Sequence, residues 1–278
     1  MPITNYQLQI RDGVRVLQLA SSDGTNRVTR ACVLELTSAM AELARDALPL
    51  IITGNDKFFS AGADLREIAA LSGRQALEFS HRGQELMNAI ADFPAPVCAA
   101  IRGYCMGGGL DLALACHCRV AAPHAIFGHR GAALGLITGW GGTQRLPRLV
   151  GKARALQMFV AAEKLSAQEA LRIGLVNEVV AHDQLIPHAR RLAERIAMVP
   201  EASVRMNKAI TMRGLQAAGV LSGMNLNGAL SAMAHTSHGP ERDKLFAAQK
   251  KGGMRGFLDE RDARFLPEPF GPKSKPKA

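Results

Sequence analysis

The sequence predicts an α/β core followed by a helical C-terminal region, and three observations support this fold class. Strand-like apolar runs alternate with helical patterns up to about residue 180, whereas the rest of the chain has mainly helical periodicity. Two stretches of glycine and other small residues each precede a helical pattern. Of the 278 residues, 47% are hydrophobic and 21% are charged, which is typical of a globular protein with a sizeable core.

The first half of the chain begins with a predicted hairpin and continues as strands and helices. Two alternating runs flank Asp12-Gly13, a pair typical of a hairpin turn. Pro94 and Pro96 end a long helical pattern, and an apolar strand follows them. We expect strands at 7–10, 14–20, 50–53, 97–101, 119–122 and 125–127. We expect helices at 29–46, 74–92 and 110–116, and a loop at 57–71 that leads into another helix.

The second half contains a glycine-rich loop at 128–143 and then mainly helices. The helices are expected to start near 143 or 144 and to cover 152–162, 166–173, 182–198 and 201–213. We therefore divide the chain into a core at 1–200, a helical region at 201–266 and a tail at 267–278. The tail holds four prolines and three lysines, so we expect it to be disordered.

The net charge of +10 favours an anionic partner. Basic and acidic residues are interspersed, no Lys/Arg block stands out, and only 5% of the residues are aromatic. A phosphate-bearing small molecule is therefore favoured over nucleic acid. No apolar run approaches the ~18 residues that a membrane helix needs, so we expect no membrane partner.

Five cysteines are present, and no secretion signal is visible at the start of the chain. An odd number of cysteines in such a chain predicts reduced thiols and a cytoplasmic protein. The run Cys116-His117-Cys118 suggests zinc, but its spacing does not suit two ligands from one loop and no second Cys/His pair matches it. We expect core thiols at a helix end and no metal.

The two glycine stretches can be interpreted as two parts of one binding site. A helix that begins at Gly107 or Gly108 presents backbone N–H groups without intrahelical partners, and glycine leaves them uncovered. Small residues at 60–64 precede a second helix in the same way. Two such N–H groups that converge on one oxygen form an oxyanion hole, which stabilises charge on an enolate or a tetrahedral intermediate. The alternative is two tight turns that need small residues only for packing.

Four motifs together resemble the enoyl-CoA hydratase/isomerase family, also called crotonases. They are FFSAGADLREI at 58–68, RGYCMGGGLDLALAC at 102–116, GWGGTQRLPRLVG at 139–151 and AQEALRIGLVNEVV at 167–180. The resemblance implies a spiral of ββα units. It also implies a helical C-terminal region that packs on a neighbouring chain, giving a homotrimer or a dimer of trimers. The ligand would be an acyl-CoA thioester, with coenzyme A as part of the substrate and no separate cofactor.

The resemblance also implies where the thioester binds. Its oxygen would lie between the backbone N–H groups of Ala63 and Gly108. The adenine and pantetheine would lie along 61–65, with Arg66 near the phosphates. The residues that would contact coenzyme A are Ala61, Ala63, Asp64, Leu65, Arg66 and Gly108.

The sequence departs from the family at its two catalytic glutamates. The first glutamate position holds Asp111 and the second holds Gly131. Asp111 lies three residues after Gly108, on one face of the first helical turn, and its reach is shorter than that of glutamate by roughly 1.5 Å, about one C–C bond. Two interpretations stay open: Asp111 is the surviving acid/base, or it only complements the helix dipole.

Other side chains near these positions are also candidates. His129 has the unperturbed pKa of a near-neutral acid/base, but its position suggests that it turns away from the site. Arg130 could bind a substrate carboxylate or form a surface salt bridge. By resemblance, His81 lies on the helix over the acyl pocket and Trp140 lines that pocket. His117 stands where the family usually has aspartate, a change expected to affect packing.

Three functions compete at this point. The first is an enoyl-CoA hydratase-like lyase that uses Asp111 as its acid/base. The second is another reaction on the same enolate, namely decarboxylation, thioester hydrolysis or isomerisation; isomerisation is disfavoured because the second carboxylate is absent. The third is an acyl-CoA-binding protein without catalysis.

Overall fold

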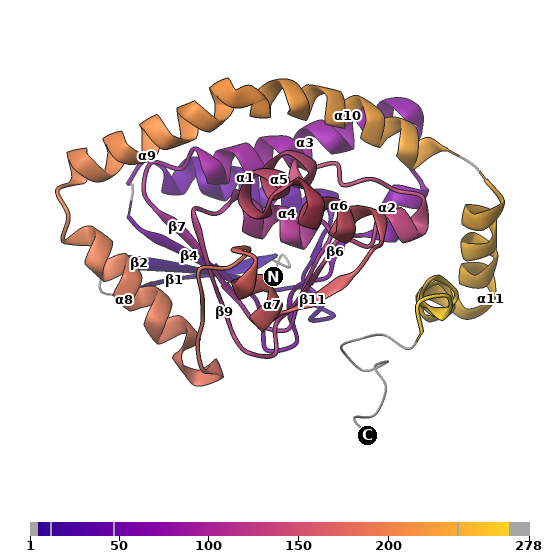
Figure 1. The fold of residues 1–278 in the computed structure, drawn as a ribbon, viewed down its shortest axis with the longest axis horizontal. Coiled ribbons are helices and arrows are strands. Elements are labelled where there is room, and N and C mark those ends of the chain that lie inside the picture. Colours follow the sequence, from indigo (N-terminus) through magenta and orange to yellow (C-terminus); the bar gives the residue numbers. More distant parts are fainter. Residues whose placement is uncertain (1–4, 12, 47, 238, 267–278) are drawn as a thin grey trace.

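Two sheets with helices around them form the core of the protein. The structure is a computed structural model that describes residues 5–11, 13–46, 48–237 and 239–266 (Figure 1). The expected tail at 267–278 lies outside the described residues. None of the helices in the described ranges combines the length and the apolar character that a membrane span requires.

The larger sheet has six strands in the order β1-β2-β4-β7-β9-β12. Its first two strands form the expected antiparallel hairpin, and every other neighbouring pair is parallel. The bounds are β1 Tyr6–Arg11, β2 Val14–Leu19, β4 Leu50–Thr53, β7 Val97–Ile101, β9 Cys118–Ala121 and β12 Glu178–Val179. The apolar runs at β4 and β7 become strands at the residues that the sequence predicted.

A second sheet holds short strands that leave the ends of the larger one. Its order is β11-β10-β8-β5, in which only β11 is antiparallel to its neighbour. The bounds are β5 Phe58–Ser60, β8 Tyr104–Met106, β10 Ile126–Gly128 and β11 Lys164–Ser166, and a further pair joins β3 Arg27–Val28 to β6 Gly62–Ala63. After each of β4, β7 and β9 the chain adds a strand to this second sheet. This repetition is the ββα spiral that the resemblance implies.

Helices cover both faces of the larger sheet. One face carries most of the core, where Leu17, Ile52 and Ile101 pack with helical side chains such as Leu36 and Leu86. The opposite face is covered by α8. The bounds are α1 Arg30–Leu43, α2 Leu65–Ala69, α3 Gly73–Ala91, α4 Gly108–Ala115, η1 Ala132–Leu134, α5 Gly142–Val150, α6 Lys152–Val160, α7 Ala167–Arg172, η2 His182–Gln184 and α8 Leu185–Ala197.

The C-terminal region packs on its own chain. Figure 1 shows α9 and α10 as one long rod that runs over α3. The following helix is kinked at Gly252 and Gly253, and its last part lines the main cavity. The bounds are α9 Glu201–Leu215, η3 Gln216–Val220, α10 Leu221–Thr236 and α11 Pro240–Ala263. Within the chain, α10 packs on α3 and the last part of α11 lines the cavity. The expected contact of this region with a neighbouring chain stays a prediction.

Candidate active site

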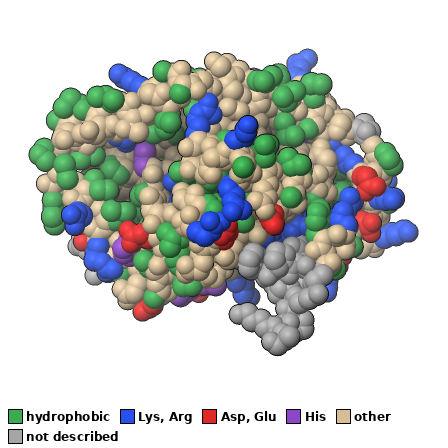
Figure 2. All heavy atoms as spheres, in the orientation of Figure 1, with side chains coloured by type: hydrophobic (Ala, Val, Ile, Leu, Met, Phe, Trp, Pro, Cys, Tyr) green, Lys and Arg blue, Asp and Glu red, His purple; other side chains and the backbone are tan. Residues whose placement is uncertain are grey.

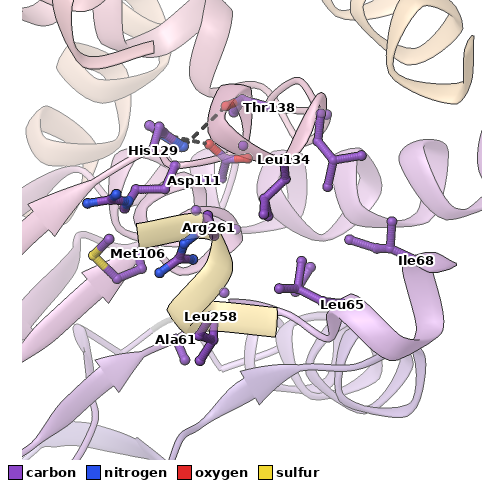
Figure 3. Close-up of a pocket in the computed structure, with 18 of the residues that line it drawn as sticks. Ala61, Leu65, Ile68, Met106, Asp111, His129, Leu134, Thr138, Leu258 and Arg261 are labelled. Atoms are coloured by element: carbon purple, nitrogen blue, oxygen red, sulfur yellow. Dashed lines mark hydrogen bonds and ion pairs between the residues drawn. The ribbon is translucent and has the colours of Figure 1, made fainter. Parts of the chain in front are cut away.

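The main cavity has a volume of about 640 Å³ and lies where the short strands meet the start of α4. The loop at 129–140 forms a second wall, and the end of α11 forms a third (Figure 3). Many of the residues singled out in the sequence line it, namely Ala61, Ala63, Leu65, Gly107, Gly108, Asp111, His129, Arg130, Gly131 and Trp140. The two glycine stretches therefore meet at one cavity.

Glycine is required where the two stretches touch. A Cβ added to Gly62, whose φ is +90°, would lie 2.6 Å from Met106 O and 3.2 Å from Gly108 N. A Cβ added to Gly108 would lie 3.4 Å from Ala63 N and 2.5 Å from the ring of Trp140. The backbone nitrogens of Ala63 and Gly108 therefore lie close together at the cavity wall. Because α4 begins at Gly108, the N–H of this residue has no acceptor within the helix.

Asp111 lies one turn into α4 and is 1% exposed. Burial raises the pKa of its carboxyl group from 3.8 to about 7. The charge of Arg145 and the backbone N–H groups of Trp140 and Gly142 oppose this rise. A Cβ added to Gly142 would lie 2.2 Å from Asp111 Oδ1, so the loop after Trp140 abuts the carboxyl group directly.

His129 follows β10 and lies beside Asp111 (Figure 3). Its Nε2 is 3.4 Å from Asp111 Oδ1, a contact without hydrogen-bond geometry, and its Nδ1 is 3.2 Å from Thr138 Oγ1. Burial lowers the pKa of His129 to about 3, so its imidazole is neutral at physiological pH. The expectation that His129 turns away from the site is wrong, and its pKa is not near neutrality.

The residues of α11 were not identified from the sequence. Asp262 Oδ1 lies 3.3 Å from Nη2 of Arg130, and both side chains are buried. The Arg130 guanidinium also lies 4.8 Å from the ring centroid of Phe265. Arg130 therefore forms a buried ion pair that docks α11, not the surface salt bridge weighed from the sequence. In Figure 3, Leu258 and Arg261 of α11 project toward the cavity opposite Asp111.

Comparisons with known proteins show the family to which the chain belongs. The family model described as enoyl-CoA hydratase/isomerase matches residues 9–266. The chain is 37% identical over 270 residues to the crotonyl-CoA hydratase of Syntrophomonas wolfei, covering 96% of this chain and 99% of that one. It is 36% identical over 261 residues to the human mitochondrial enoyl-CoA hydratase domain-containing protein 2, covering 91% and 86%. A crystal structure of an enoyl-CoA hydratase/isomerase from Xanthobacter autotrophicus superposes with a TM-score of 0.86 at 26% identity, covering 94% and 98%.

The chain belongs to the enoyl-CoA hydratase/isomerase family. Two residues that this family resemblance assigned to coenzyme A do not line the cavity. Asp64 caps α2 and binds Arg66, with 2.6 Å between Oδ2 and Nη2. Burial raises the pKa of Asp64, but the hydrogen bonds from Arg66 outweigh it and lower the pKa overall. The Arg66 side chain is 62% exposed and lies outside the cavity wall.

The two remaining pocket candidates differ in position. Trp140 lines the cavity, and its Nε1 donates to Phe79 O at 3.2 Å. His81 was expected over the acyl pocket, but it is exposed on α3 and is not among the lining residues. It faces α10, where a Cβ added to Gly228 would lie 3.2 Å from its Cδ2.

The Cys-His-Cys run has a structural role. His117 Nδ1 accepts the N–H of Val97 at 2.8 Å, and Nε2 lies 3.0 Å from Ala91 O. Burial lowers the pKa of His117 to about 4. The neutral ring therefore ties the end of α3 to the start of β7.

Proposed function

We propose that the protein hydrates a short-chain 2-enoyl-CoA thioester, adding water across the double bond. The observation that carries this proposal is the single cavity that brings together two backbone N–H groups and one titratable carboxyl group, those of Ala63, Gly108 and Asp111. Membership of the enoyl-CoA hydratase/isomerase family supports it, as does the similarity to a protein named crotonyl-CoA hydratase.

In this mechanism, the thioester oxygen accepts hydrogen bonds from the N–H groups of Ala63 and Gly108. Those bonds strengthen as negative charge moves onto the oxygen and an enolate forms. The Asp111 carboxylate removes a proton from a water molecule while the oxygen of that water bonds to the β-carbon of the thioester. The same proton then passes from Asp111 to the α-carbon, which restores the carboxylate and completes the addition.

Neutral His129 complements this cycle. When Nδ1 carries the ring proton and donates a hydrogen bond to Thr138 Oγ1, the unprotonated Nε2 faces Asp111 Oδ1. Protonated Asp111 then has an acceptor beside it while it holds the substrate proton. His129 thus offers a neutral acceptor beside the acid form of Asp111.

Coenzyme A binding is proposed from basic residues in the cavity wall. Lys164, Arg255 and Arg261 line the cavity together with Asp259 and Asp262, and the exposed Arg255 is suited to a phosphate group. Arg66 is paired with Asp64 outside the lining, and its exposed guanidinium is a second candidate. Calorimetry with acetyl-CoA should show saturable binding, and the absence of heat and competition at millimolar ligand would contradict it.

The decisive experiment is a panel of thioesters followed by ultraviolet absorbance and mass. Crotonyl-CoA should lose its enoyl absorbance and gain the mass of one water. Turnover of malonyl-type thioesters alone would instead favour decarboxylation, which needs the oxyanion hole and little acid/base chemistry. Tight binding without turnover of any thioester would favour a non-catalytic acyl-CoA-binding protein.

We also propose a homotrimer or a dimer of trimers. Large hydrophobic side chains remain exposed on the outer faces of α9 and α10, including Ile210, Leu226 and Met233. Figure 2 shows hydrophobic side chains gathered along the upper edge of the molecule, where these helices run. The cytoplasmic location stays a prediction, since one of the relatives above is named as mitochondrial.

A further inference from the structure

The loop at 138–142 separates the active-site cavity from a set of buried polar side chains. Three successive carbonyl groups of this loop each accept a hydrogen bond from a different helix. The bonds run from Asn227 Nδ2 to Thr138 O at 2.7 Å, from Gln84 Nε2 to Gly139 O at 2.9 Å, and from Arg145 Nη1 to Trp140 O at 3.3 Å. The donors belong to α10, α3 and α5; α3 and α10 are far from the loop in the sequence, whereas α5 follows it directly.

The other side of the same loop faces the acid/base groups. Thr138 Oγ1 lies 3.2 Å from His129 Nδ1. Gly142 abuts Asp111, because a Cβ added there would lie 2.2 Å from Oδ1 and 3.1 Å from His129 Nε2. A small movement of the loop would therefore change the surroundings of both Asp111 and His129.

The two amide side chains that hold the loop are buried and well bonded. Asn227 is 5% exposed and Gln84 is 6% exposed. Asn227 Nδ2 also donates to Thr143 Oγ1 at 3.0 Å, and Gln84 Nε2 also donates to Met224 O at 3.1 Å. Buried amide groups are unfavourable unless they are hydrogen-bonded, and here their donors are directed to the loop and its surroundings.

We propose that Asn227 and Gln84 are positioning residues of the active site. By holding the carbonyl groups of Thr138 and Gly139, they fix the loop whose opposite face contacts His129 and Asp111. Through Asn227, α10 thereby contributes to the active site of its own chain. This contribution is separate from the apolar face that α10 exposes. The kinetic test of this proposal rests on the proposed function, whereas a spectroscopic test does not.

The spectroscopic test uses Trp140, which is the only tryptophan of the chain and lies in the loop. Asn227→Leu and Asn227→Asp should shift the emission of Trp140 to longer wavelength and raise its quenching by acrylamide at least twofold. Asn225→Asp is the matched control, because Asn225 is exposed on the same helix. Wild-type emission and quenching in both Asn227 variants would overturn the proposal.

A pH titration of the same fluorescence tests the link to Asp111. The groups that face Asp111 are His129, Arg145 and Cys105. Burial lowers the pKa of His129 to about 3, lowers the pKa of the Arg145 guanidinium and raises the pKa of the Cys105 thiol. Emission should therefore change near pH 7 in the wild type and not in Asp111→Asn. In Asn227→Leu, a looser loop would move the backbone N–H groups of Trp140 and Gly142 away from the Asp111 carboxylate, which they stabilise. The midpoint of the fluorescence titration should therefore rise by about half a pH unit or more. An unchanged midpoint would count against positioning.

Kinetics with crotonyl-CoA separate this proposal from the proposed function. Asn227→Leu should lower kcat ~10- to 100-fold with KM within about twofold, because a misplacement of ~1 Å near reacting groups has an effect of this size. Gln84→Leu releases Gly139 O and provides the same test if Asn227→Leu does not fold. Wild-type kcat in a folded Asn227 variant would overturn positioning while leaving hydration intact. If the wild type hydrates no thioester, the proposed function fails and the fluorescence still decides the positioning.

Discussion

Burial governs the behaviour of the two titratable residues of the candidate site. It raises the pKa of Asp111 and lowers the pKa of His129, so both groups favour their neutral forms. Motif matching placed Asp111 correctly at the cavity. The orientation of His129 could not be predicted in this way, because it depends on how the chain turns between β10 and η1. Its pKa could not be predicted either, since burial is a property of the folded chain.

The first prediction concerns Asp111 as a base. The carboxylate form is populated above its pKa, so kcat for hydration should rise with pH and level off above about 7. Asp111→Asn should lower kcat by ~100- to 10,000-fold and leave thioester affinity nearly unchanged, because the oxyanion donors are backbone groups. Stopped-flow hydration between pH 5 and 9 measures both. Full turnover by Asp111→Asn would leave Asp111 with only a helix-dipole role.

At the scale of single elements, the sequence predicts long and periodic segments well. The apolar strands β4 and β7 and the amphipathic helices α1 and α3 appear within a few residues of their expected bounds. Several strands of two or three residues, such as β6 and β8, were missed because they are too short for alternation to show, whereas β10, expected at 125–127, is present at Ile126–Gly128. They exist because neighbouring backbone in the spiral offers them hydrogen-bond partners.

The start of α4 provides the second prediction. Gly108→Ala adds a Cβ 2.5 Å from the Trp140 ring and 3.4 Å from Ala63 N, so the Trp140 ring or the backbone around the proposed oxyanion hole must move. We expect kcat/KM for crotonyl-CoA to fall at least ~10-fold. Gly214→Ala is the matched control: it lies in α9 with no atom within 4 Å of the added Cβ, and alanine favours the helix there by ~0.5–1 kcal/mol. Equal kcat/KM for the two variants would argue against the oxyanion assignment.

The docking of α11 gives the third prediction. Asp262→Asn removes one charge of a buried ion pair with Arg130, a change whose typical cost is ~3–5 kcal/mol when the other charge stays buried. The end of α11 should then exchange its amide hydrogens faster, as measured by hydrogen–deuterium exchange and mass spectrometry. Glu260→Gln, an exposed position two residues earlier, should leave exchange unchanged. Unaltered protection at 254–263 in Asp262→Asn would show that the ion pair does not hold the helix.

At the scale of the whole molecule, α9 and α10 leave an apolar face exposed. Ile210 of α9 is 73% exposed and Met233 of α10 is 67% exposed, and Leu215, Leu221, Leu226 and Leu230 are exposed between them. A large contiguous apolar patch of this kind marks an interaction surface. The apolar runs in this region were visible in the sequence. The contact of α11 with the cavity was not visible in the sequence, because no motif marks a contact between segments so far apart.

The fourth prediction is the mass in solution. Light scattering at micromolar concentration should give about three or six times the chain mass of 29.7 kDa. The double variant Ile210→Glu with Met233→Glu should reduce that mass, because like charges on the covered face oppose association. A monomer mass for the wild type would remove the assembly proposal and leave the cavity assignment unaffected.

The position of α11 in the wall of its own chain's cavity has a consequence for any assembly. Among the described residues, α11 forms a wall of the cavity of the chain to which it belongs, and we therefore expect each copy in an assembly to act independently. Thioester binding should then reach one equivalent per chain along a hyperbolic isotherm with a Hill coefficient near one. In hybrids that mix wild-type chains with Asp111→Asn chains, turnover should be proportional to the wild-type fraction, as expected for independent active sites within one oligomer.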